Sequence, residues 1–330
     1  MSKEEQHITS IGGQAVMEGV MMRGPYKTAV AVRKPDGEIE TKIEENGVKT
    51  RNKFFRLPII RGCVNFVDSL VIGMKALMWS AEFVDIEGDE EEEESKFDKW
   101  LEDKLGDKIK DVVIYFSVVI ALVFSVVLFM LLPTFLTSLV EGLGSHVSWL
   151  NAITQTQTFT SVFEGIIRMV IFLGYMALVS QMKEIKRVFE YHGAEHKTIA
   201  CYEAGEELTV ENVKKYTRFH PRCGTSFLLF VMIISIILFA FLPRFDGYIR
   251  ILSILLRMGT RLLLLPVVAG LSYEVIKLAG RSKAKCVGWL SKPGLWLQKL
   301  TTREPDASQI EVAIASMEPC IPENKEDDKW

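Results

Sequence analysis

Long uncharged apolar segments are separated by strongly charged ones along this chain. Val112 to Leu132 (VVIYFSVVIALVFSVVLFMLL) has no charged residue and is long enough to cross about 30 Å of hydrocarbon as a helix. Similar segments run from Met169 to Met182, from Thr225 to Leu242 and, interrupted by two arginines, from Ile251 to Tyr273. A buried helix of a soluble protein rarely runs this long without a polar face. The pattern predicts a mainly α-helical, polytopic membrane protein with about four transmembrane helices.

In residues 1–55, apolar and polar residues alternate with a shorter period than in the apolar segments. The segment TAVAVRKPDGEIETKIEE alternates apolar and polar residues around Pro35-Asp36-Gly37, which predicts a β-hairpin within a small cytoplasmic unit. The preceding GGQAVMEGVMMRGP is rich in glycine and methionine, and we expect a shaped loop or a short helix there rather than a strand.

Residues 56–85 are apolar but carry Arg61, Asp68 and Lys75 at seven-residue intervals, so the charges share one helix face. This pattern predicts an amphipathic helix lying on the membrane surface, with a short re-entrant segment as the alternative. A fifth full span would carry three charges into lipid, which is costly.

Four further segments follow: an acidic linker (86–110), a four-span membrane domain (111–280), an interfacial and cytoplasmic segment (281–318) and a disordered tail (319–330). Trp289 and Trp296 stand among lysines, which is typical of a chain at the lipid headgroup level. Asp306 and Gln309 match the capping-box pattern and predict the start of a short helix.

The distribution of charge predicts the orientation. Lysines and arginines cluster on one side of the predicted spans, whereas Pro133 to Ile167 contains none, so both termini are expected in the cytoplasm. The first ten residues are polar and predict no signal peptide. The odd number of cysteines, 5, indicates reduced thiols rather than a disulfide framework. The basic residues follow membrane edges and form no basic face with stacking aromatics, so we expect no nucleic-acid partner.

The segment YHGAEHK carries the most specific chemistry. His192 and His196 are four residues apart and share one face of a helix. With Glu195 they form H-x-x-E-H, the reverse order of the zinc-protease motif. We expect the two histidines to bind a metal ion and Glu195 to act as a general base on metal-bound water.

Two other segments bring ligand-type residues to the same predicted membrane face. FHPRCGTSF holds His220 and Cys223, and GLSYEVIK holds Glu274. Nitrogen, thiolate and carboxylate donors together suit a divalent metal, zinc or iron. The third ligand is expected from Glu274, His220, Cys223 or Glu18, with Glu274 favoured. Cys223 as a fourth protein ligand would instead close the site and make it structural.

Charged residues near these motifs have further candidate roles. Arg222 is a candidate for stabilising an anionic intermediate or binding a phosphate, and Glu18 and Arg23 are further candidate site members. Glu164 and Arg168 are one turn apart near the outer side, where we expect arginine side chains to extend to the headgroups and Glu164 to pair with one of them.

The segments SIGGQAVMEGVMMRGP, YHGAEHKTIACYEAGEELTVENV, FHPRCGTSFL and PGLWLQKLTTREP resemble the YqhQ-like family of bacterial membrane proteins of unknown function. The resemblance extends from about Ile11 to Ile314. It implies a multi-pass protein of the bacterial plasma membrane and a predicted metal-dependent enzyme, and it supplies no substrate. The residues in stretches typical of the family are His192, Glu195, His196, His220, Cys223 and Glu274.

The sequence thus predicts a membrane protein with a metal site at the cytoplasmic boundary, which hydrolyses an amide or ester bond of a membrane-associated substrate. One alternative is a non-catalytic scaffold or interaction protein with a structural metal. Another is a transporter or membrane-insertion factor, in which Arg257, Arg261 and Glu164 line a polar path. The lipid bilayer is the expected partner, and the oligomeric state is left open.

Overall fold

A computed structural model describes residues 7–46, 53–84, 109–144, 156–242, 245, 249–281 and 285–329. The chain forms two compact units. The first contains Met1–Val84, Tyr175–Ser235 and Thr260–Trp330, and the second contains Asp85–Gly174 and Ile236–Gly259.

The first unit contains a four-stranded antiparallel sheet in the order β1-β2-β3-β4, with strands Gly12–Val16, Gly19–Arg23, Lys27–Arg33 and Ile39–Glu45. The predicted hairpin is β3–β4, and Gly37 in its turn has a φ of +89°, which favours glycine. The prediction of a loop or short helix for GGQAVMEGVMMRGP was wrong, because this segment forms the β1–β2 hairpin.

Burial of both faces explains why the alternation was hidden in β2. Met22 points into a core on one face of the sheet, and its neighbour Met21 points into a second core on the other face. A strand covered on both sides needs apolar residues at consecutive positions, so it loses the apolar–polar alternation of an exposed sheet.

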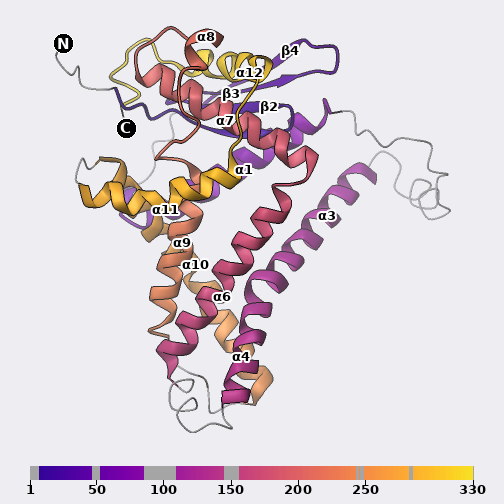
Figure 1. Cartoon of the computed structure of the whole chain (residues 1–330), viewed down its shortest axis with the longest axis vertical. Coiled ribbons are helices and arrows are strands. Elements are labelled where there is room, and N and C mark those ends of the chain that lie inside the picture. The colour runs from indigo at the N-terminus through magenta and orange to yellow at the C-terminus, as the bar shows by residue number, and fades with distance from the viewer. Residues whose placement is uncertain are drawn as a thin grey trace, which may run out of the picture. The chain divides into compact units, whose positions relative to one another are not determined.

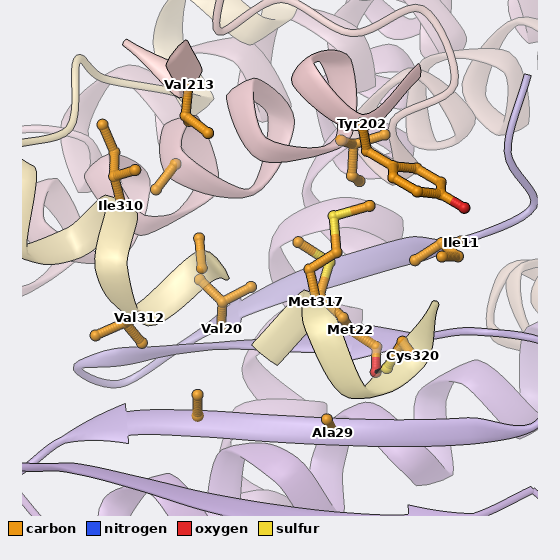
Figure 2. Packing of buried hydrophobic residues seen from close by; sticks show 14 of the residues in the cluster. Ile11, Val20, Met22, Ala29, Tyr202, Val213, Ile310, Val312, Met317 and Cys320 are labelled. Carbon is orange, nitrogen blue, oxygen red and sulfur yellow. Dashed lines mark hydrogen bonds between the residues drawn. The ribbon is translucent and has the colours of Figure 1, made fainter. Parts of the chain in front are cut away.

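Helices cover both faces of the sheet (Figure 1). Helices α7 (Lys183–Glu203) and α12 (Ala307–Met317) pack on one face, and α1 (Ile60–Ala81) packs on the other. Figure 2 shows Val20 and Met22 of β2 gathered with Ile310 and Met317 of α12 in the first core. The predicted capping box of α12 is confirmed, since the Asp306 side chain accepts from the Gln309 backbone and the Gln309 side chain accepts from the Asp306 backbone.

The C-terminal tail is folded onto the first unit, so the prediction of a disordered segment over 319–330 was wrong for its described residues. Lys329 forms a β-bridge with Thr9. Asp328 is fully buried and accepts hydrogen bonds from the Thr9 hydroxyl at 2.6 Å and the Tyr202 hydroxyl at 3.0 Å. Terminal residues are often disordered unless they are tied down, and here the polar groups of the tail find buried partners.

The apolar segments form helices α3 (Ile109–Val126), α4 (Leu132–Gly144), α6 (Gln157–Val179), α9 (Gly224–Phe239) and α10 (Arg250–Arg281), followed by α11 (Lys285–Thr301). Among the described residues, four helices are long and apolar enough to cross a membrane: Ile60–Ala81, Phe116–Leu143, Thr158–Val179 and Leu255–Leu278. This set differs from the predicted one, because α1 qualifies and α9, with 16 residues, is shorter. Residues 86–108 of the predicted acidic linker lie outside the described part of the chain.

Within the second unit, Pro133 lies inside a continuous helix rather than ending it. A π-helical turn, Val127–Leu131, precedes it. Proline has no N–H to donate to the carbonyl of Phe129 four residues earlier, and the Arg168 Nε donates to that oxygen at 2.8 Å. Arg168 also pairs with the buried Glu164 at 3.0 Å. The expected pairing of Glu164 is therefore confirmed, but Arg168 points to a backbone carbonyl rather than to headgroups.

Candidate metal centre

Helix α7 places the two histidines of YHGAEHK side by side. The ring centroids of His192 and His196 lie 4.4 Å apart, as their four-residue spacing predicts. This helix is separate from the preceding apolar helix, since α6 ends at Val179 and α7 begins at Lys183 after a turn. We had expected the motif at the end of a membrane span. It lies instead within the sheet-containing unit.

Backbone carbonyls hold both imidazole rings by the same nitrogen. The Nδ1 of His192 lies 2.8 Å from the carbonyl oxygen of Thr301, and the Nδ1 of His196 lies 2.6 Å from that of Arg218. A carbonyl can only accept, so each Nδ1 carries the proton and each Nε2 keeps its lone pair. Metal-binding histidines are commonly oriented in this way, through the nitrogen that does not bind the metal.

Cys223 completes a group of three ligand-type side chains. Its sulfur lies 3.2 Å from the Nε2 of His192. One ligand atom from each of His192, His196 and Cys223 lies within 4.8 Å of the other two. The His196 Nε2 is buried and has no hydrogen-bond partner among the described residues. An unpaired acceptor in the protein interior is costly, so this atom is positioned for a ligand.

Burial governs the protonation of the neighbouring groups. It lowers the pKa of His196, which favours the neutral imidazole that can bind a metal. Burial also raises the pKa of Glu195 to about 7, against the opposing effects of His192 and of a hydrogen bond from the Gly13 N–H. The Glu195 side chain packs so closely on β1 that a Cβ at Gly13 would lie 2.8 Å from its Cγ.

Arg222 and His220 belong to a neighbouring polar network. The Arg222 guanidinium forms an ion pair with Glu203 and donates to the carbonyl oxygen of Thr9 at 3.0 Å. Burial alone would raise the pKa of Glu203, but hydrogen bonds from His220 and Arg222 hold it below its usual range. The ring of His220 lies 5.6 Å from that of His196. Both residues were predicted for the site, and both lie beside the three candidate ligands, but the charge of Arg222 is already compensated by Glu203.

Two predicted carboxylate ligands lie in ion pairs outside this group. Glu274, the favoured third ligand, binds the Nε of Arg61 at 2.7 Å and also its terminal nitrogen. The close crossing of α1 and α10 at Gly62 and Gly270 brings these two side chains together. Glu18 pairs with Arg187 and accepts from the Tyr191 hydroxyl at 3.3 Å. The structure therefore brings neither glutamate to the histidines.

A cavity of about 260 Å³ opens beside the cluster. Its walls come from the chain before and along β1, from the end of β2, from α1, from α7 and from the turn that precedes α9. The polar and charged residues that line it are Thr9, Ser10, Gln14, Arg23, Ser69, Glu195, His196, His220, Arg222 and Cys223. Glu195 and two of the three candidate ligands thus share one cavity with Arg23.

Several contributors to the site have little or no signal in the sequence. The carbonyls of Thr301 and Arg218 act through the backbone, which any residue type supplies. Gly193 does have a signal, since it interrupts the helical motif. A Cβ at this position would overlap the carbonyl oxygen of Arg303, so only glycine allows the segment after α11 to pack against α7.

Comparison with known proteins identifies a family but no activity. Residues 57–323 match the family model described as "Protein of unknown function (DUF1385)". The chain is 35% identical over 314 residues to the "Uncharacterized protein YqhQ" of Bacillus subtilis (strain 168), covering 92% of this chain and 90% of that relative. No solved structure matches.

Replacing Gly193 by alanine should destabilise the protein although alanine is the better helix former. The new methyl group would force α7 away from Arg303 and from the Thr301 carbonyl that holds His192, at a cost of about 1–3 kcal/mol. The loss of stability is measured by thermal unfolding in detergent. Gly174→Ala in α6, where no atom lies within 4 Å of the added Cβ, is the matched control and should be neutral or slightly stabilising. Equal unfolding temperatures for the two variants would contradict the close packing at Gly193.

Proposed function

This chain belongs to the DUF1385 family of proteins of unknown function, and we propose that it is a metal-dependent hydrolase that cleaves an amide or ester bond at the cytoplasmic surface of the membrane. One observation carries the proposal. The two histidines of α7 have their Nδ1 atoms held by carbonyls and their Nε2 atoms available beside the Cys223 thiol, next to a cavity that Glu195 also lines.

The distances fit a small transition-metal ion. A tetrahedral zinc ion places nitrogen and sulfur ligands about 3.4–3.6 Å apart, from bonds of about 2.0–2.3 Å. The separation of 3.2 Å between His192 Nε2 and Cys223 Sγ is close to this value. All separations in the group lie within 4.8 Å, so a bound ion would require a contraction of about 1 Å at most. Imidazole and thiolate donors suit zinc or iron.

Three protein ligands leave the fourth position of a tetrahedral ion open to the cavity, which favours a catalytic site over a structural one. A bound ion would supply Lewis acidity, which activates a water molecule and polarises the substrate carbonyl. Glu195 lies one residue before His196 and lines the same cavity. Its carboxylate would accept the proton of the attacking water and return it to the leaving nitrogen or oxygen as the C–N or C–O bond breaks.

The packing of α1 supports a location at the membrane boundary. Its C-terminal half packs on the sheet through Gly73, Ala76 and Ser80. An open sheet edge cannot enter hydrocarbon, because its backbone groups would lose their hydrogen-bond partners. The large apolar side chains that α1 leaves between 44% and 56% exposed are Val67, Leu70, Val71, Met74 and Met78. We therefore place α1 along the membrane surface with these residues toward lipid.

The metal content of detergent-purified protein tests the proposed ligands. About one equivalent of zinc or iron is expected in the unmodified protein, and the His192→Ala/His196→Ala double variant should lose most of it. Cys223→Ser should weaken binding at least tenfold. Glu274→Gln is the control. This variant should keep its metal, because the Glu274 carboxylate pairs with Arg61 and lies outside the proposed ligand group. Equal, near-zero metal in the unmodified protein and the double variant would refute the metal site.

Replacing Glu195 by glutamine separates catalysis from a structural role of the metal. The amide keeps nearly the same shape but cannot accept a proton, so hydrolysis of amide or ester compounds should fall by about 10²–10⁴-fold while the metal content stays unchanged. The measurement is product release from a panel of N-acyl and O-acyl compounds. Full activity of the Glu195→Gln variant would exclude this residue as the base, and retained cellular function without any hydrolysis would favour the scaffold with a structural metal.

Depth measurements with spin labels in lipid nanodiscs test the orientation of α1. An interfacial helix should place labels at Val67 and Met78 at similar depth, with both in contact with lipid. A spanning helix would separate the same two positions by about 16 Å along the membrane normal, from a rise of about 1.5 Å per residue. A label at Glu44, exposed on β4, is the control and should stay in water.

A further inference from the structure

Arg23 is the one arginine of the cavity whose charge the described residues leave without a partner. It ends β2, and its side chain is partly buried and lines the cavity. Within the described part of the chain, its guanidinium group has no hydrogen bond or ion pair. The other arginine of the cavity, Arg222, is paired with Glu203 and with the carbonyl of Thr9. Arg23 therefore presents up to five N–H donors in a fork that matches a carboxylate or a phosphate.

The surroundings of Arg23 favour an anion. Gly12 is directly opposite Arg23 in the β1–β2 register, and no atom lies within 4 Å of the position that its Cβ would occupy. The residue paired with Arg23 therefore adds no side chain that would fill the space beside it. Ser10 and Ser69 also line the cavity and supply hydroxyl groups that can donate to an oxyanion.

With the proposed metal bound, the net charge of the cavity also favours an anion. A divalent ion on two neutral imidazoles and one thiolate keeps a net charge of +1, and Arg23 adds a second positive charge. An ionised Glu195 would compensate only one of the two. A cavity of about 260 Å³ has room for one acidic group together with the atoms next to it.

We propose that Arg23 binds an anionic group, a phosphate or a carboxylate, of the molecule whose bond is cleaved at the His192–His196–Cys223 cluster. The assignment of this molecule as a substrate rests on the proposed function, whereas anion binding at Arg23 does not. Arg23 thus selects an acidic substrate by a two-point hydrogen bond, while the cluster and Glu195 act on a bond farther along the same molecule.

Calorimetric titration of the full-length protein in detergent tests this inference, with inorganic phosphate and succinate as separate probes and with metal content measured on each sample. At least one probe should bind the unmodified protein, and Arg23→Gln should weaken its Kd about 10- to 100-fold. Arg23→Lys should lie between the two, since it keeps the charge but loses the two-point geometry. Lys42→Gln, which removes an exposed charge on β4, is the control and should leave the Kd unchanged.

Each outcome is decisive. Binding of phosphate alone identifies a phosphorylated substrate class, and binding of succinate alone identifies a carboxylic acid. The inference is overturned if neither probe binds up to about 50 mM, a concentration far above the Kd expected for a charge-assisted pair, or if Arg23→Gln binds as the unmodified protein does. Arg23-dependent binding by a protein that contains no metal would refute the proposed hydrolase and leave the anion site in place. Unchanged metal content and circular dichroism of Arg23→Lys show that the fold is retained.

Discussion

The close packing of α7 between the sheet and the segment after α11 is the constraint on which the candidate site depends. Two glycines make it possible. Gly193 admits the backbone of Arg303 on one side of the helix, and Gly13 admits the Glu195 side chain on the other. With α7 held at these distances, the Thr301 carbonyl reaches the Nδ1 of His192 and fixes the orientation of its ring. The arrangement of the candidate ligands is thus a consequence of backbone packing rather than of the histidines alone.

Ionisable residues of the apolar helices are used in local interactions that stabilise the fold. Arg168 donates a hydrogen bond to the Phe129 carbonyl, which Pro133 cannot bind because proline has no N–H. Arg168 also pairs with Glu164, whose carboxylate accepts from the Thr134 hydroxyl at 2.9 Å. In the other unit, Arg61 pairs with Glu274 where α1 crosses α10. Burying such groups unpaired would be expensive, and these contacts account for Arg168, Glu164, Arg61 and Glu274 without a transport path. Of the three residues named for a polar path, Glu164 is thus explained by its pairing with Arg168.

Local patterns correctly predicted two features that depend on neighbours in sequence. The four-residue spacing of His192 and His196 placed them on one helix face, and Asp306 and Gln309 marked the start of α12. The β1–β2 hairpin was missed because both faces of β2 are buried, which removes the alternation that identifies a strand. The order of the tail was missed because Asp328 is stabilised by Thr9 and Tyr202, residues far away in sequence.

The sequence by itself determined the apolar helices, the helical pairing of the two histidines, and the grouping of nitrogen, thiolate and carboxylate donors as candidate ligands. Only the tertiary structure decided that Cys223, and not Glu274, stands beside the histidines, and that Arg23 faces the same cavity. The physical reason is that spacing along a helix is a local property, whereas the third candidate ligand depends on which distant backbones approach each other. Gly193 lets the segment that carries the Thr301 carbonyl approach His192, and the Gly62–Gly270 crossing brings Glu274 to Arg61; at both places the absence of a side chain, rather than its chemistry, determines the contact.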